Sequence, residues 1–106
     1  MIFVKRNKQD QLYISRDCYK ALNSDYIVVM VNVNDRQIAF VPCQKDANHS
    51  VKIHTHIDHT KWEQHYLCRK AIVSLFKGFN RYKGKFYKQD NCVIFKVRGE
   101  IKIWRN

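Results

Sequence analysis

The feature that most constrains the fold is a pattern of elements that occurs twice in the chain. Residues 11–41 read as a short strand, a short helix and two strands joined by a turn, and a similar order follows residue 50. An internal repeat decides the architecture, because like units bury their apolar faces against each other. The sequence therefore predicts a single domain over residues 1–106, with halves at 1–43 and 51–106.

The first half carries distinct signals for its elements. Leu12–Ile14 is a brief apolar strand, and Ser15 stands where a helix N-cap accepts a backbone N–H. Cys18 and Leu22 share one apolar face of a helix of about two turns. Further strands are predicted at 1–5 on the edge of the sheet, at 26–33 and at 37–41.

The second half is expected to repeat this order with a longer helix. Thr60 and Glu63 fit a capping box, in which each side chain binds the backbone N–H of the other residue. An apolar stripe at helical spacing then predicts a helix over 61–77 that ends near Gly78. Strands are predicted at 51–57, 81–87, 91–97 and 101–104.

A literal match of letters gives a different alignment of the two halves. Tyr13–Leu22 is similar to Tyr66–Leu75, but this register sets a strand end against the middle of the expected helix. Ser15 is therefore paired with Thr60, and the second copy begins near Val51. The expected fold class is α+β, with two β-α-β-β half-repeats that form one compact single-chain pseudo-dimer and a strand at each terminus.

Charge is the strongest signal of function. The formal net charge is +11, and residues 69–88 hold seven basic residues and no acid. A chain tolerates such self-repulsion more readily when its partner is a polyanion. Between Lys77 and Lys88 the cations also alternate with aromatic residues, a mixture typical of nucleic-acid surfaces. The plainer alternative is a basic composition that serves solubility alone.

The chain is expected to be cytoplasmic and to have no membrane partner. It begins without a long apolar segment, and its apolar runs are too short to span a bilayer. Its four cysteines contain no CxxC pair. In a reducing compartment we expect them to be buried thiols that fill the core.

Residues 12–42 combine a short strand, a Ser-capped helix with Ala21 and Leu22 near its end, a long apolar strand and a strand that closes at Pro42. This combination resembles the AbrB/SpoVT/MazE swapped-hairpin family, as a diverged tandem repeat of the kind seen in small phage-type proteins. The family's Pro after the first strand is Ser15 here, its Gly-Asp before the long strand is replaced at 24–25, and its Gly after the hairpin is absent.

The resemblance implies binding to duplex DNA by an intertwined dimer, through basic residues near the first strand and the start of the helix. Counterparts in the second half, together with the basic aromatic stretch, would widen this surface. The expected nucleic-acid-binding residues are Lys5, Arg6, Lys8, Arg16, Lys20, Lys61, Arg69, Lys70, Lys77, Arg81, Lys83 and Lys85.

The string HTHIDH at residues 54–59 matches a metal motif of metallo-β-lactamase-fold hydrolases. That fold needs a much longer chain and two further histidine ligands downstream, whereas only His65 follows here. We therefore interpret His54, His56 and His59 as a solvated histidine-rich strand edge. Carboxylates are scarce and no nucleophile–base pair stands out, so no enzyme activity, metal or cofactor is expected.

Together these observations predict a small DNA-binding regulatory protein that contacts duplex DNA through a basic face. Phosphate contacts would supply most of the affinity, and a few arginines would reach base edges. The alternative is a phage-encoded inhibitor, similar to an anti-CRISPR protein, that binds a host defence or replication protein complex. A homodimer is compatible with either hypothesis.

Overall fold

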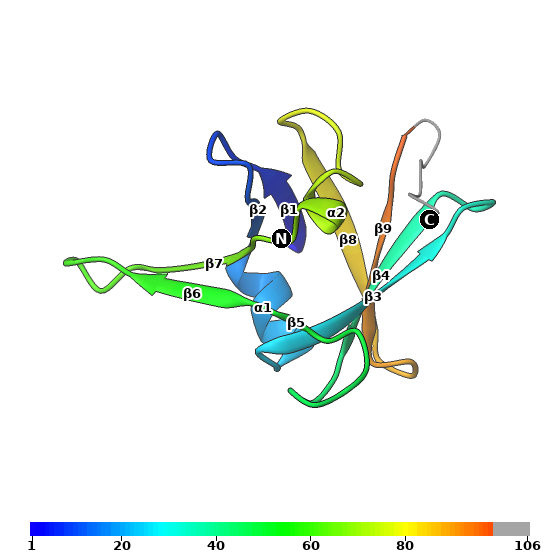
Figure 1. Cartoon of the computed structure of the whole chain (residues 1–106), viewed down its shortest axis with the longest axis horizontal. Helices are drawn as coiled ribbons and strands as arrows, with labels where there is room; N and C mark the ends of the chain where they lie inside the picture. The colour runs from blue at the N-terminus through cyan, green and yellow to red at the C-terminus, as the bar shows by residue number, and fades with distance from the viewer. Residues whose placement is uncertain (99–106) are drawn as a thin grey trace.

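The computed structural model describes residues 1–98 as a sheet-rich structure (Figure 1). Strands hold 44% of these residues and helices 11%, so the sheet dominates the fold. The strands are β1 (Phe3–Arg6), β2 (Leu12–Ile14), β3 (Tyr26–Asn32), β4 (Gln37–Pro42), β5 (Val51–Lys52), β6 (His54–Ile57), β7 (Glu63–Leu67), β8 (Arg81–Tyr87) and β9 (Cys92–Lys96). The helices are α1 (Arg16–Leu22) and α2 (Lys70–Val73).

The strands form one antiparallel sheet that nearly closes on itself. Its order is β5-β3-β4-β9-β8-β1-β2-β7-β6. The first and last strands of this order, β5 and β6, are separated in the chain by Ile53 alone. One bent segment therefore connects both margins, and the sheet curls around the core in a barrel-like form (Figure 1).

The core lies on the inner face of this curled sheet. Phe40, Phe76 and Phe95 meet there, and the rings of Phe76 and Phe95 lie edge to face with centroids 5.7 Å apart. Helix α1 adds Cys18 and Leu22, and α2 adds buried side chains of its own. Both helices therefore pack on the inner side, which leaves the outward side chains of the strands to solvent.

The first helix is confirmed with its caps. The Ser15 hydroxyl accepts a hydrogen bond from the Cys18 backbone N–H at 3.3 Å and another from the Phe3 N–H at 3.0 Å. The helix ends at Asn23, which takes the left-handed conformation with φ 50°. Ser15 thus ties the start of α1 to β1.

The helix expected over 61–77 is wrong. This segment begins as β7, which pairs with β2 and β6, and only α2 is helical. The capping box is also wrong, because Thr60 lies in the β6–β7 turn and Glu63 lies in β7. There the Asp58 carboxylate accepts the backbone N–H groups of Thr60 and Trp62 at 2.8 and 3.0 Å.

The second half therefore does not show the expected β-α-β-β order. Both halves instead run hairpin, helix, hairpin: β1-β2-α1-β3-β4, and β6-β7-α2-β8-β9. The alignment of Tyr13–Leu22 with Tyr66–Leu75 places β2 on β7 and α1 on α2. The expected pairing of Ser15 with Thr60 is therefore wrong.

Left-handed backbone occurs at matching points of the two halves. The matching residues are Asp10 and Lys61 in the first turns, Asn23 and Gly78 after the helices, and Arg36 and Asn91 in the last turns. Asn7 and Asp58 also cap equivalent turns, because each side chain accepts the N–H groups two and four residues later. The two halves thus share turn geometry as well as element order.

Three smaller expectations also differ from the structure or fall outside it. Strand β1 is not an edge strand, because it lies between β8 and β2. Cys18 and Cys92 are buried, but Cys43 is half-buried and Cys68 is exposed, so not all cysteines fill the core. The strand expected at 101–104 lies outside the described residues.

Candidate functional site

The outward side chains of β1, β8 and the end of β9 form a basic surface. Successive strand residues point to opposite faces, and Val4 and Tyr82 point inward. Their neighbours therefore point outward, as expected for β8. We call the following set the outer basic face: Lys5, Arg81, Lys83, Lys85, Lys96 and Arg98, all of them exposed.

Like charges stand directly opposite each other on this face. Lys5 of β1 is the cross-strand partner of Arg81 of β8. Like charges in such a pair destabilise a sheet. The Arg81 guanidinium lies over the ring of Phe3, 4.5 Å from its centroid, a cation–π contact that fixes its position. A bound anion would relieve the repulsion between the two cations.

The face is hollowed beside β9. A depression of about 600 Å³ is lined by Asn80, Arg81, Tyr82, Lys83, Lys96 and Arg98. Four of these six side chains are cations, and no carboxylate is among them. Guanidinium and ammonium groups gathered around such a hollow suit phosphate oxygens.

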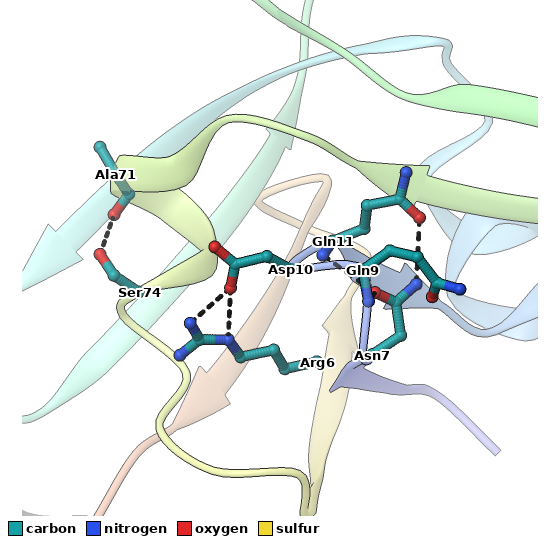
Figure 2. A network of polar contacts seen from close by, with 7 residues as sticks. All are labelled: Arg6, Asn7, Gln9, Asp10, Gln11, Ala71 and Ser74. Atoms are coloured by element: carbon teal, nitrogen blue, oxygen red, sulfur yellow. Dashed lines mark hydrogen bonds and ion pairs between the residues drawn. The ribbon is translucent and has the colours of Figure 1, made fainter.

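A second hollow lies on the other side of the Lys5–Arg81 pair, where the β1–β2 turn meets β7. Its volume is about 500 Å³, and its lining combines Lys5 and Lys8 with Tyr13 and Phe79. Figure 2 shows how this turn is held: the Asn7 carboxamide accepts the Gln9 and Gln11 backbone N–H groups at 3.0 and 2.9 Å. The hollow thus has a fixed polar rim beside exposed aromatic surface.

Arg6 is the cation of this turn that already has an anion. Its guanidinium pairs with the Asp10 carboxylate, and Nε donates to Asp10 Oδ1 at 2.9 Å (Figure 2). The pair is part of the turn itself, so Arg6 is less available to a ligand than Lys5 or Lys8.

An aromatic row continues the outer surface across the sheet. From Lys5 the cross-strand partners are Tyr13 on β2, Tyr66 on β7 and His54 on β6. The His54 and Tyr66 rings are stacked with centroids 5.4 Å apart, and the Phe3 and Tyr13 centroids are 5.9 Å apart. Cations and rings therefore occupy one continuous surface.

The remaining expected binding residues are not brought to this face. Arg16 and Lys20 are exposed on α1, which packs on the inner side of the sheet. Arg69 and Lys70 line a separate hollow of about 410 Å³ with Lys52. The structure thus spreads the expected set over several surfaces.

Two further members of that set lie in connecting segments. Lys61 has φ 63° in the β6–β7 turn. Lys77 follows α2, and its carbonyl accepts the Tyr82 hydroxyl at 2.5 Å. Neither belongs to the outer basic face as defined here.

The face includes residues that were not expected from the sequence. Lys96 and Arg98 flank the buried Val97, and this alternation is visible in the sequence. Tyr13 and Tyr66 gave no such signal, because the pairing of β2 with β7 brings together strands from different halves.

The histidines and cysteines of residues 1–98 were also considered as metal ligands or nucleophiles in the sequence. No three His, Cys, Asp or Glu side chains in this range come together in a way that could hold a metal ion. His54 and His56 do share one face of β6, with Thr55 between them. Burial raises the pKa of the Cys18 thiol to about 12, so this thiol stays protonated near neutral pH.

Comparisons of the chain with protein families, curated proteins and solved structures find no match. Within the described chain, neither helix has the length and apolar character needed to cross a bilayer.

Proposed function

We propose that the protein binds nucleic acid through the outer basic face. The observation that carries the proposal is the Lys5–Arg81 pair, which places like charges side by side on neighbouring strands. The hollow beside β9 adds three more cations to the same surface. A phosphate backbone offers repeated negative charges that match this arrangement, and counterion release would drive the association.

The proposed role is that of a small regulator rather than an enzyme. Cationic contacts of this kind hold the phosphate backbone, and any sequence preference must come from base contacts. The sequence analysis expected duplex DNA as the ligand. The charges alone support duplex and single strand equally, because both carry phosphates.

We also propose that the two halves are a diverged repeat folded as a single-chain pseudo-dimer, related to the swapped-hairpin family. The matching turns and left-handed residues support it. So does the pairing of β2 with β7, in which Tyr13 faces Tyr66, its counterpart in the letter match. The pairing of β4 with β9 likewise joins corresponding strands.

The test removes charge from the face and from a matched surface elsewhere. We expect Arg81→Ala with Lys83→Ala to weaken binding about tenfold or more and to lower the salt slope by about two. Arg16→Ala with Lys20→Ala removes the same charge from α1 and should change affinity much less. Binding is measured by fluorescence anisotropy with labelled oligonucleotides at about 50 and 200 mM salt.

Three results would each overturn the proposal. Equal affinity of the Arg81/Lys83 variant and the wild type would remove the outer basic face as the site. A larger loss in the Arg16/Lys20 variant would move the site to α1, where the family resemblance placed it. Absence of salt-sensitive binding by the wild type at micromolar protein would overturn nucleic-acid binding altogether.

A second candidate function is inhibition of a protein complex, as the sequence analysis also allowed. The β6–β7 hairpin favours it, because this hairpin projects from the body of the molecule (Figure 1). Ile57 and Trp62 lie at its end, and each is 57% exposed. Large apolar side chains at such a position are typical of protein contacts. Recovery of one stoichiometric protein partner, without nucleic acid, would favour this function.

A further inference from the structure

We infer that the nucleic acid bound by the outer basic face is single-stranded, with bases stacked on its aromatic row. This inference rests on the proposed function and specifies the ligand of the same site. Its basis is the continuous cross-strand row of Lys5, Tyr13, Tyr66 and His54, bordered by Phe3 and Phe79.

The rings of this row are not needed to fill the core. Strand alternation places Tyr13 between the buried Leu12 and Ile14, so its ring points outward. Tyr66 lies outward in the same way between the buried His65 and Leu67. Both rings are half-buried, so part of each remains open to solvent.

Phe79 gives the strongest sign of a ligand. Its side chain is 60% exposed, although it lines the hollow that also holds Lys5 and Lys8. An exposed Phe that lines the same hollow as two lysines suits a nucleotide, whose base can stack on the ring while its phosphate binds the cations. A cationic surface that served solubility alone would gain nothing from this ring.

The dimensions of the face argue against a duplex. The row from Arg81 to His54 crosses five strands, a width of about 19 Å at about 4.8 Å per strand. The major groove of B-DNA is about 12 Å wide and admits one helix or a two-stranded ribbon. In a duplex, moreover, the faces of the bases are already stacked on one another. An unpaired strand can lie across the row with its bases free.

The experiment compares ligands and ring variants in the full chain. A labelled single strand of about 16 nucleotides and the duplex of the same sequence are titrated by fluorescence anisotropy. We expect the single strand to bind at least tenfold tighter. Tyr13→Leu with Phe79→Ala should weaken single-strand binding at least fivefold and leave the salt slope unchanged, because no cation is removed.

Tyr26→Leu is the matched control. Tyr26 is another half-buried tyrosine, next to the buried Ile27 on β3, a strand that carries no residue of the outer basic face or of the aromatic row. We expect it to bind as the wild type does. Phe79→Ala alone removes one ring at a mostly exposed position, so its effect on folding should be smallest. Thermal unfolding checks that every variant is folded.

The outcomes separate this inference from the proposed function. Tighter binding to the duplex, or full single-strand affinity in both ring variants, would overturn the single-strand inference. Salt-sensitive binding that depends on Arg81 and Lys83 would still support nucleic-acid binding in that case. Absence of binding to either ligand would overturn both.

Discussion

At the scale of single residues, His65 stands out because it is buried and titratable. Its ring is 2% exposed and stacks on Tyr19 with centroids 3.7 Å apart. Nδ1 lies 2.9 Å from the Thr55 hydroxyl. Burial lowers the pKa of His65, with a smaller contribution from Arg16, whereas the carboxylates of Glu63 and Asp25 act in the opposite direction.

This pKa predicts a loss of stability in weak acid. Because the folded pKa is lower than the unfolded value of 6.5, the unfolded chain takes up the proton first as the pH falls. The contribution of this group to the free energy of unfolding should be greatest well above pH 6.5. It should fall as the pH drops through 6.5 towards the lower pKa of the folded state. Chemical denaturation at several pH values measures it.

His65→Gln should flatten this pH dependence while it keeps a polar partner for Thr55. His56→Gln, at an exposed histidine in the same hairpin, is the matched control variant. The pKa values of Asp17 and Asp58 are lowered from 3.8, so these carboxyl groups change the free energy of unfolding only at a lower pH than His65 does. An equal slope in wild type and His65→Gln would contradict the assignment.

At the scale of elements, the packing of β8 on β9 depends on the absence of a side chain. Gly84 is the cross-strand partner of Phe95. A Cβ at position 84 would lie 2.5 Å from a Phe95 ring atom and 2.9 Å from a Val93 methyl group. The Phe95 ring therefore occupies the space that Gly84 leaves open.

Gly84→Ala should lower the free energy of unfolding by about 1–3 kcal/mol, because the Phe95 ring must move within a packed core. Gly78→Asn is the control. Gly78 has φ 72° and no neighbour of its Cβ position within 4 Å, and Asn23 takes the same left-handed conformation after α1. Urea denaturation of both variants checks this, and equal stability of Gly84→Ala and wild type would refute it.

Elements with a single dominant pattern could be predicted from the sequence, as α1 and the alternation of β8 show. Strand β7 could not. Its buried residues His65 and Leu67 are two apart, as in a strand. His65 also fits a helical stripe, whose other members are Trp62, Tyr66, Ile72, Val73 and Phe76. In so short a segment both periods match, and the pairing of β7 with β2 decides the outcome.

The same limit applies to the candidate site. Lysines that alternate along β8 were predictable as one exposed row, because strand periodicity is local. Their neighbours Lys5, Tyr13 and Lys96 belong to strands distant in the sequence, and no local pattern states which strands pair. The aromatic row exists only because β2 and β7 are neighbours.

At the scale of the whole molecule, the two halves are interlocked. The pairs β1–β8, β2–β7, β4–β9 and β3–β5 all join strands from different halves. Neither half therefore has a complete sheet of its own. The connecting segment between β4 and β5 is the place to cut the chain without touching a strand.

We expect fragments 1–47 and 48–106 to be unfolded when separate and to regain structure when mixed. Each fragment alone exposes the strand edges and the apolar face that the other fragment covers in the whole protein. The apolar burial and hydrogen bonds left to one fragment do not offset the conformational entropy that it would lose on folding. Far-UV circular dichroism and the dispersion of amide proton chemical shifts in NMR spectra report whether each fragment, and the mixture, is folded. Cooperative unfolding of either fragment alone would show that a half folds independently.

The position of β1 between β2 and β8 also bears on how the protein is made. During translation, residues 3–6 leave the ribosome long before residues 81–83, with which β1 pairs. One edge of this first hairpin therefore stays bare, and its apolar side chains stay uncovered, until residues 81–83 have been synthesised and have left the ribosome. Strand β1 can therefore complete its pairing only after β8 has left the ribosome. Until then, the nascent chain is a natural client for chaperones that shield strand edges.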